Sequence, residues 1–506
     1  MRTIPESVTE WLDAAAARFP DKTALHDESG NLTYKEYRTE ALALAREIIQ
    51  RNLKQSPVAV YLDKGIHVLT SFFGIAYSRN CYSPVDTALP AARISRMLSI
   101  LQPKAAITKR SLAPAFSSAG FTGEYIFLED IVPDADDEKI VSELKTAYNR
   151  EDLLYILFTS GSTGIPKGVS ITHRSVLNYI EWACKTFAFT EADSFANQAP
   201  FYFDNSILDI YCAAKSGAEL FITPANLFAQ PVPLLNYLKT HQITTIFWVP
   251  SALVGPAKLK AFRNVDVSAS LKRVLFCGEV MSVRQLNIWR AFLPDALYAN
   301  LYGPTEITDA CTYYIVNRDF PDTEPLPIGK PIDNVEILLL NEGDDGLCKA
   351  AGGEAGEICV SGVCLSAGYY NNPEKTAEVF VEYPKGSGRT IYKTGDLARL
   401  NSDGDLIYLS RKDFQIKHLG HRIELGEIEA AADSVPGVTV SCVLYDNVKH
   451  KLFLFAETDI SAEKCSEQLK QLLPEYMLPS KIIIMDKIPI NCNGKIDRTS
   501  LKEYMK

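Results

Sequence analysis

The sequence predicts an α/β fold: a large N-terminal domain of several subdomains, with mostly parallel sheets and a small β-rich unit, then a small α+β C-terminal domain. Strand-like and helix-like segments alternate along most of the chain, as they do in parallel sheets covered by helices. Continuous apolar runs at 244–250 and 274–276 are typical of strands buried on both faces. Glycine and acidic residues become more frequent at 341–410, where turns separate short strand-like runs.

Two helices near the N-terminus are predicted from capping patterns. Ser7 is followed three residues later by Glu10, and Thr33 is followed in the same way by Glu36. A hydroxyl residue and a glutamate at this spacing can each satisfy a free backbone N–H group of the first turn. Apolar residues recur at helical spacing after Ser7, and a strand pair around Gly30 is expected between the two helices.

The later elements divide into two groups. A strand at 58–62 and an apolar helix at 68–76 continue the first alternation. After Arg411 the pattern starts again with a helix, two strands, a helix and a strand, at 424 onward, 438–445, 452–456, 463–473 and 481–485. About a hundred residues is a typical size for an independent unit. We therefore predict two domains, residues 1–410 and 411–506.

Composition and charge limit the possible functions. The chain has 506 residues and a net charge of −10, which argues against a nucleic-acid partner because phosphate backbones bind clustered lysine and arginine. Its eleven cysteines are scattered without a C-x-x-C pair, a pattern that fits a reducing compartment. The sequence has neither an apolar N-terminal segment nor a run of about 18 apolar residues. We therefore expect a cytoplasmic protein without a membrane span.

The most informative stretch is a loop that follows a short buried strand. The apolar run 153–158 leads into six small or hydroxylated residues, 159–164, and Lys167 follows them. Glycine lets backbone N–H groups converge on phosphate oxygens, and lysine adds a positive charge. A Walker-type loop needs glycine before the lysine and serine or threonine after it, but Pro166 and Gly168 stand there. A flexible linker is the other alternative, although linkers do not normally follow a buried strand.

Four further stretches accompany this loop. They are Asn300-Leu-Tyr-Gly-Pro-Thr-Glu306, Tyr392-Lys-Thr-Gly-Asp396, Arg411-Lys-Asp-Phe-Gln-Ile-Lys417 with Gly420-His-Arg-Ile-Glu424, and Asn493-Gly-Lys-Ile-Asp-Arg498. Each alone could be a turn. Together and in this order they resemble the core motifs of the adenylate-forming superfamily, which includes acyl-CoA synthetases, luciferases and nonribosomal adenylation domains. The resemblance covers nearly the whole chain.

The resemblance implies two reactions and a mobile C-terminal domain. A carboxylate would attack the α-phosphorus of ATP to give an acyl adenylate and pyrophosphate, and a thiol would then attack the adenylate. The C-terminal domain would swivel at Asp413, with Lys417 and Gly420 on the segment that serves thiol transfer. ATP and Mg²⁺ are the implied cofactors, because negative charge that develops in such reactions is stabilised by backbone donors, lysine and a divalent metal.

The same resemblance implies roles for individual residues. Lys495 would bridge the substrate carboxylate and the α-phosphate, Lys167 and Thr305 would act on the phosphates, and Glu306 would bind the metal. Asn300, Tyr302, Gly278 and Glu279 would form the adenine site, and Asp396 would accept the ribose hydroxyls with Tyr408 and Arg411 beside it. The remaining nucleotide-binding positions would be Thr159, Ser160, Gly161, Ser162, Thr163, Gly164, Leu301, Gly303 and Pro304. Taken alone, Lys495 would be an ordinary solvated lysine in a turn.

An aspartate indicates the class of carboxylic acid. Asp204 stands where amino-acid-activating members keep an aspartate for the substrate ammonium, and a buried carboxylate is costly unless it is paired. An N-cap or turn aspartate before Ser206 is the alternative. The other implied pocket residues are Asn205, Leu208, Phe247, Leu275, Cys277, Leu301, Asp309, Ala310 and Lys495. Asp309 could pair with a second amine of a basic substrate, or cap the following segment outside the pocket.

The chain resembles in particular free-standing amino-acid adenylating enzymes such as D-alanine:D-alanyl carrier protein ligases, and part of its pocket resembles that of proline-activating enzymes. We therefore expect activation of a small amino acid, D-alanine or a proline-like one, and transfer to the phosphopantetheine of a carrier protein. Because no carrier domain follows before Lys506, the carrier is expected to be a separate protein. The alternatives are an acyl-CoA synthetase and a non-catalytic nucleotide-binding protein.

Overall fold

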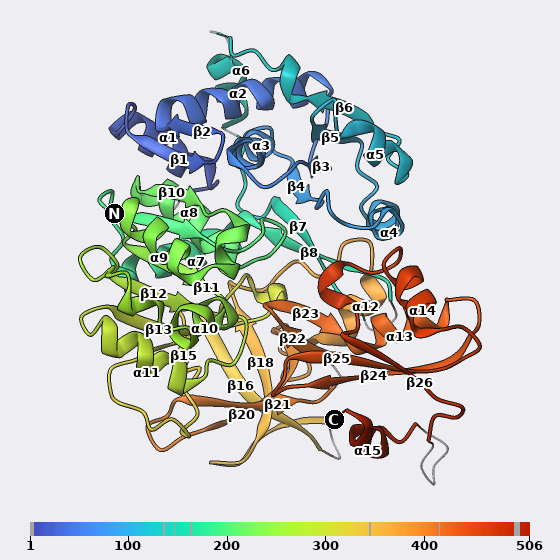
Figure 1. Cartoon of the computed structure of the whole chain (residues 1–506). Helices are drawn as coiled ribbons and strands as arrows, with labels where there is room; N and C mark the ends of the chain where they lie inside the picture. Colours follow the sequence, from blue (N-terminus) through green and yellow to red (C-terminus); the bar gives the residue numbers. More distant parts are fainter. Residues whose placement is uncertain are drawn as a thin grey trace.

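The computed structural model describes residues 5–134, 137–145, 147–161, 164–343, 346–413, 415–489 and 496–505. Within these residues it contains a nine-stranded sheet, two six-stranded sheets, a three-stranded sheet and a two-stranded hairpin. Helices pack on the mainly parallel sheets, an antiparallel unit follows, and a small α+β unit comes last (Figure 1). The predicted α/β fold class is confirmed.

The first six-stranded sheet has the order β6-β5-β3-β4-β7-β8, and its pairs are parallel apart from β7 with β8. Its strands are β3 (Pro57–Tyr61), β4 (Cys81–Pro84), β5 (Ala105–Thr108), β6 (Glu124–Phe127), β7 (Leu153–Thr159) and β8 (Lys167–Thr172). Every residue of β3, β4 and β5 is buried. Such continuous burial explains the unbroken apolar runs of the sequence.

The nine-stranded sheet has the order β15-β14-β13-β12-β11-β9-β10-β1-β2. Its strands are β1 (Thr23–Asp27), β2 (Gly30–Thr33), β9 (Ser194–Asn197), β10 (Glu219–Ile222), β11 (Thr245–Trp248), β12 (Arg273–Phe276), β13 (Leu297–Tyr302), β14 (Thr312–Ile315) and β15 (Lys330–Pro331). The six central strands from β1 to β13 run parallel. Their carboxyl ends therefore share one edge, where open α/β sheets bind ligands.

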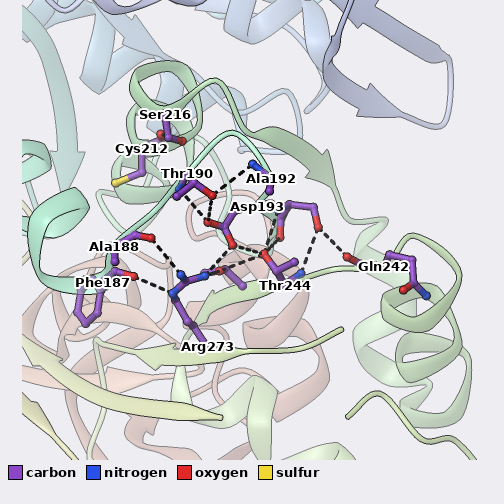
Figure 2. Close-up of polar contacts among 12 residues, drawn as sticks. Phe187, Ala188, Thr190, Ala192, Asp193, Cys212, Ser216, Gln242, Thr244 and Arg273 are labelled. Carbon is purple, nitrogen blue, oxygen red and sulfur yellow. Dashed lines mark hydrogen bonds and ion pairs between the residues drawn. The ribbon is translucent and has the colours of Figure 1, made fainter. Parts of the chain in front are cut away.

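A polar cluster joins the strands at the opposite, amino-terminal edge (Figure 2). Asp193 accepts hydrogen bonds from Arg273 Nη1 at 2.7 Å and from Thr244 Oγ1 at 2.8 Å. Arg273 Nε also donates to the carbonyl oxygen of Phe187 at 2.8 Å. Burial opposes ionisation of Asp193, but these hydrogen bonds and the Arg273 charge lower its pKa. Both carboxylate oxygens are satisfied, so this edge has a structural role.

Helices flank the two mainly parallel sheets. They are α1 (Thr9–Arg18), α2 (Tyr34–Gln50), α3 (Ile66–Tyr77), α4 (Ala91–Leu101), α5 (Ala113–Ser118), α6 (Asp137–Lys145), α7 (His173–Phe187), α8 (Ser206–Ser216), α9 (Pro231–Thr240), α10 (Pro250–Lys258) and α11 (Val283–Phe292). No helix within the described ranges combines the length and the hydropathy that crossing a bilayer requires. The ten cysteines of those ranges are free.

The two predicted capping boxes have different outcomes. Thr33 and Glu36 form a complete box at the start of α2. The box at Ser7 is only half made: Ser7 N donates to Glu10 Oε1 at 3.2 Å, but Ser7 Oγ accepts from Thr9 N at 3.3 Å. The prediction was wrong for the second half because α1 begins at Thr9, with Val8 as its N-cap.

The antiparallel unit follows residue 334 and contains β16 (Val335–Gly343), β17 (Gly346–Lys349), β18 (Gly356–Gly362), β19 (Phe380–Glu382), β20 (Thr390–Leu400), β21 (Leu406–Arg411) and the helix α12 (Pro373–Val379). The C-terminal segment, residues 411–505, contains β22 (Gln415–His418), β23 (His421–Glu424), α13 (Leu425–Asp433), β24 (Val438–Asp446), β25 (Lys451–Thr458), α14 (Ala462–Leu469), β26 (Lys481–Ile484) and α15 (Arg498–Leu501). The predicted domain boundary at 410 and 411 stays a prediction.

The three-stranded sheet of β24, β25 and β26 is covered on both faces. Alternate residues of β24 point to different clusters: Val443 packs with α13 and α14, whereas Leu444 packs with Ile488 and Leu501. In Figure 1, α13 and α14 lie above this sheet and α15 lies below it. The face with α13 is the one that contacts the rest of the chain, through the Arg93–Glu427 ion pair.

Candidate active site

One pocket lies where the two mainly parallel sheets meet the C-terminal segment. Its lining comes from the end of β7, the segment before α8, the loop after β13, the end of the antiparallel unit and the hairpin of β22 and β23. It includes Thr159, Ser160, Asp204, Asn205, Gly278, Gly303, Pro304, Thr305, Asp396, Arg411, Gln415, Lys417, Gly420 and Arg422. The structure thus brings together seven of the sixteen predicted nucleotide-binding residues, the predicted substrate aspartate, and the segment predicted to serve thiol transfer.

The loop after β7 turns sharply. A Cβ atom on Gly161 would lie 1.9 Å from the carbonyl oxygen of Ile165, so this backbone approach requires glycine. Ser160 Oγ donates to the carbonyl oxygen of Arg422 at 2.7 Å. Thr159 Oγ1 is buried without a hydrogen-bond partner among the described residues. Ser162 and Thr163, also predicted to bind phosphate, lie outside those residues.

Lys167 begins β8 and lies near Arg422, which lines the pocket. Its Nζ atom lies 3.8 Å from Glu424 Oε1 and 5.3 Å from the centroid of the Tyr369 ring. Burial lowers the pKa of Lys167, and the nearby Arg422 charge lowers it further. The carboxylates of Glu306 and Glu424 do not offset this effect, so a buried ammonium group here is well suited to an added anion such as a phosphate.

Glu306, the predicted metal ligand, is fully buried in the 3₁₀ turn η4 (Thr305–Ile307). It accepts hydrogen bonds from Tyr369 Oη at 2.8 Å and from Arg422 Nη1 at 2.6 Å. Burial opposes its ionisation, but the charges of Arg422 and Lys167 outweigh burial and hold its pKa at about 2. Glu306 is therefore ionised, and its cationic partner in this structure is the Arg422 guanidinium group.

The donor set allows Mg²⁺ only together with a nucleotide. In the described ranges there is no group of three or more histidine, cysteine, aspartate or glutamate side chains that could hold a metal ion. Mg²⁺ commonly binds through one or two carboxylates plus substrate phosphates. Glu306 can provide the carboxylate, provided that Arg422 has moved away.

A second carboxylate, Asp396, lies on β20 at the predicted ribose site. Its Oδ2 accepts from Tyr302 Oη at 2.6 Å, and its Oδ1 accepts from Arg411 Nη1 at 2.9 Å. Arg411 also binds Asp413 through two further nitrogen atoms, at 2.7 and 2.8 Å. The rings of Tyr302 and Tyr408 lie 6.4 Å apart between centroids. Thus the predicted ribose residues and the predicted hinge residue Asp413 belong to one bonded network.

Two predicted adenine residues have other partners in this structure. Asn300 Nδ2 donates to the carbonyl oxygen of Pro327 at 2.8 Å. Glu279 accepts from Ser251 N and from Gly420 N, each at 2.8 Å. Glu279 therefore connects the N-terminal sheet to the hairpin, a contact that the sequence did not predict.

The hairpin of β22 and β23 inserts into the pocket through its turn. Gly420 has a φ of +82°, and a Cβ atom there would lie 2.8 Å from Val249 Cγ1. Lys417 Nζ lies 5.8 Å from the centroid of the Tyr302 ring. Next to the turn, His421 stacks on Tyr476 with 3.7 Å between ring centroids. A side chain at 420 would therefore disturb this close contact between the two parts of the chain.

A buried ion pair also connects α4 to α13. Arg93 and Glu427 form an ion pair whose side chains are 6% and 1% exposed. Breaking one partner of such a buried pair is strongly destabilising, so it holds the C-terminal segment in this orientation. Sequence reasoning missed Arg93, Arg422 and Tyr476. Arg422 could have been found, because it lies within the recognised motif at 420–424.

The predicted substrate pocket is mainly apolar. Asp204 is 9% exposed, and its pKa is raised by burial, although hydrogen bonding to Thr305 opposes the rise. The apolar residues that were predicted with it are buried in one continuous cluster: Leu208, Phe247, Leu275, Cys277, Leu301 and Ala310. Asp204 does not act as an N-cap, since the cap position of α8 is Asn205 and no side chain caps it.

Asp309 is buried near this pocket. Its Oδ2 accepts a hydrogen bond from Tyr179 Oη on α7 at 2.7 Å. Burial raises its pKa well above the usual range, and repulsion from Asp204 contributes. Lys495, by contrast, lies outside the described residues; its neighbour Ile496 packs on the α15 face of the C-terminal sheet.

Several similar proteins align with almost the whole chain. Zwittermicin A synthase ZmaJ of Bacillus cereus is 32% identical over 98% of this chain and 94% of its own length. Tyrocidine synthase 1 of Brevibacillus parabrevis is 31% identical over 98% of this chain and 45% of its own length. For tyrocidine synthase 3 of the same organism, 33% identical over 99% of this chain, the aligned share of that protein is 8%. The chain thus spans less than half of several of these relatives.

Solved structures share the fold. The Vibrio cholerae adenylation domain AlmE, in complex with glycyl-adenosine-5'-phosphate, superposes with a TM-score of 0.85 at 23% identity, covering 100% of this chain and 98% of that one. The NpsA-ThdA adenylation–PCP fusion from Klebsiella oxytoca gives a TM-score of 0.81 at 22% identity, covering 95% and 94%. At these identities the likeness concerns the fold alone.

A family model provides the remaining comparison. The model of the AMP-binding enzyme family matches residues 12–370, which include the loop after β7, Asp204 and Glu306. The match covers more than half of the chain and agrees with the adenylate-forming motifs of the sequence. The chain belongs to the AMP-binding enzyme family of adenylate-forming ligases.

Proposed function

We propose that the chain activates a small amino acid with ATP, releasing pyrophosphate, and then transfers the aminoacyl group to the phosphopantetheine thiol of a carrier protein. The observation that carries this proposal is Asp204, a buried carboxylate in the pocket that also contains the phosphate loop. An ammonium group is the natural partner for it. D-alanine and a proline-like amino acid are the substrates that the sequence resemblance suggests. The AlmE structure holds a glycyl adenylate in a similar fold.

In the first reaction, an oxygen of the substrate carboxylate attacks the α-phosphorus, and the bond to the pyrophosphate oxygen breaks. Asp204 fixes the ammonium group, so that the carboxylate is oriented for attack. Lys167 and the loop after β7 hold the phosphates, and Thr305 lies beside Asp204. Bound Mg²⁺, held by Glu306, would neutralise phosphate charge. Arg422 must leave Glu306 before this reaction.

In the second reaction, the thiol sulfur attacks the acyl carbon, the bond from that carbon to AMP breaks, and the thiol proton is released to solvent. We assign the orientation described above to this step, because the hairpin of β22 and β23 lines the pocket. We propose that the C-terminal segment turns about Asp413 between the two reactions. Arg411 would remain on Asp396 during the turn, since it ends β21 and precedes the proposed hinge at Asp413.

The acceptor is proposed to be a carrier protein that can act in trans. The NpsA-ThdA fusion joins an adenylation domain to a PCP domain, which supports a carrier rather than coenzyme A as the acceptor. Incubation with ATP, the amino acid and a separate holo-carrier protein should produce a thioester that mass spectrometry of the intact carrier detects. Transfer to coenzyme A in place of the carrier would contradict this assignment.

ATP–pyrophosphate exchange with a panel of acids tests the first reaction. We expect exchange with at least one amino acid and little with its analogue that lacks the α-amine. Preference for acids without the amine, together with loading of coenzyme A, would identify an acyl-CoA synthetase. ATP binding without exchange for any acid would identify a non-catalytic nucleotide-binding protein.

Gly420→Leu is expected to spare exchange and to slow carrier loading about tenfold to a hundredfold. The side chain would meet Val249 at 2.8 Å and would impose a left-handed backbone on leucine, a strain of roughly 1–3 kcal/mol. Gly404→Leu is a matched control, because Gly404 has a similar φ of +76° with nothing within 4 Å of its Cβ position. Equal loss of both reactions in Gly420→Leu would remove the support for two orientations.

A further inference from the structure

The Asp309 carboxyl group has an oxygen without a partner. Its side chain is deeply buried, with a relative exposure of 1%. Oδ2 is bonded to Tyr179, whereas Oδ1 has no hydrogen-bond partner in the described part of the chain. Buried polar atoms in native proteins nearly always have a partner, so an exception needs an explanation.

A second buried aspartate shows what a structural role looks like in this molecule. Asp193 accepts hydrogen bonds at both of its oxygens, from Arg273, Thr244 and Thr190. Among the residues that the structure describes, neither an arginine nor a backbone N–H group donates to Asp309. Both Thr308 and Asp309 have positive φ angles, 65° and 69°. A β-branched residue adopts such a backbone only when its surroundings impose it.

Two other polar atoms near Asp204 are also buried without a partner among the described residues. Tyr155 Oη on β7 and Asn205 Nδ2 before α8 are buried, and neither has a hydrogen-bond partner within the described ranges. The pKa of Tyr155 is raised first by burial and then by the charges of Asp204 and Asp309. Unsatisfied polar groups from three elements therefore surround the substrate aspartate.

The surroundings of Asp309 are mainly apolar, and the nearby carboxyl groups of Asp204 and Asp209 both raise its pKa. Asp209 has the charge of Lys64 near it. Ala310, Leu275 and Tyr179 belong to one hydrophobic cluster with Tyr155. Two carboxylates in such a place are costly unless each has a cation. The α-ammonium group of an ordinary amino acid can serve only one of them. A hydroxyl group could satisfy Oδ1, but only a cation would also restore the ionised form of Asp309, whose pKa burial and Asp204 raise.

We propose that the substrate is an α-amino acid whose short side chain ends in an amine, with its α-ammonium on Asp204 and its side-chain ammonium on Asp309. This inference rests on the proposed function. It disfavours D-alanine and proline, because neither has a side-chain donor for Asp309. Asp309 is accordingly a specificity-determining residue, and Tyr179 positions its carboxylate by holding Oδ2.

Isosteric pairs of amino acids test the inference with the unmodified protein. ATP–pyrophosphate exchange is measured for 2,3-diaminopropionate against 2-aminobutyrate, 2,4-diaminobutyrate against norvaline, and ornithine against norleucine, as both enantiomers. We expect kcat/KM to favour the diamino member of at least one pair by about 100-fold or more, because a site built to bind a polar group strongly rejects the analogue that lacks it.

Variants at position 309 assign the preference to this side chain. Asp309→Leu should reverse the ranking within the best pair, and Asp309→Asn, which keeps an acceptor for Tyr179, should reduce the preference at least about tenfold. Asp209→Asn is the control, since Asp209 is an equally buried carboxyl group with one bonded oxygen, Oδ2 on Asn197 at 3.0 Å, and one oxygen, Oδ1, without a partner within the described ranges. The control should keep the ranking of the unmodified protein.

The outcomes separate this inference from the proposed function. Exchange that favours the apolar member of every pair overturns the inference and leaves amino-acid activation intact. A preference that survives Asp309→Leu assigns it to another residue and also overturns the inference. If no α-amino acid supports exchange, the proposed function itself fails.

Discussion

Asp204→Ala is expected to reduce exchange with an amino acid by several hundredfold or more. The substitution would leave the substrate ammonium buried without its counter-ion, and breaking a buried pair on one side costs roughly 3–5 kcal/mol. The proposed nucleotide contacts lie on other elements, at the loop after β7 and at Asp396. ATP affinity, measured by calorimetry, should therefore change little.

A desamino analogue provides the sharper measurement for Asp204→Ala. The analogue should gain relative to the amino acid, because alanine removes the cost of facing an unpaired carboxylate. Asp209→Asn, on the helix α8 that follows Asp204, should leave the ratio of the two rates unchanged. A preference of the unmodified protein for the desamino acid would show that our assignment of the pocket is wrong.

Lys495→Ala is expected to slow adenylate formation by roughly two to three orders of magnitude, the usual effect of removing a preorganised charge from a transition state. Ile496, its neighbour, packs with Ile488 and Leu501 on the face of the C-terminal sheet opposite α13. In Figure 1, α15 lies on the side of this sheet away from α13. Because the sequence resemblance implies a mobile C-terminal domain, we expect the lysine to act after this segment has turned.

Two assays distinguish this role from a general loss of structure. Transfer from a synthetic aminoacyl adenylate to the carrier should remain close to that of the unmodified protein in Lys495→Ala. Gly420→Leu should show the opposite behaviour, with exchange kept and transfer lost. Near-normal exchange in Lys495→Ala would exclude Lys495 from adenylate formation.

The fold could be predicted because its signals are local. The buried strands β3, β11 and β12 follow from short apolar runs, and the helix α2 from a capping box that Thr33 and Glu36 complete. A turn after β7 was expected from the composition of that loop, and the role of the loop in phosphate binding stays a prediction. Capping at Ser7 failed because the boundary of a short helix depends on one hydrogen bond, which tertiary packing can move.

The remaining site residues could not be predicted because they depend on docking. Arg93 pairs with Glu427 across 334 residues of sequence, and Arg422 pairs with Glu306 across 116. Neither pairing follows from helical or strand periodicity. Asp309 was placed in the pocket by resemblance, but its unsatisfied oxygen becomes visible only when every neighbouring donor is known.

The hairpin of β22 and β23 provides charged partners for two residues, Glu306 and Lys167, that are proposed to bind Mg²⁺ and the ATP phosphates. Arg422 forms an ion pair with Glu306, and Glu424 lies close to Lys167. The charges of Glu306 and Lys167 are therefore compensated by residues of the hairpin. Molecules in this state must release both pairs before ATP phosphates can bind. The apparent dissociation constant for ATP then equals the intrinsic one divided by the fraction of molecules with the hairpin withdrawn. Any partner that holds the C-terminal segment away from the pocket would therefore strengthen ATP binding without touching the nucleotide.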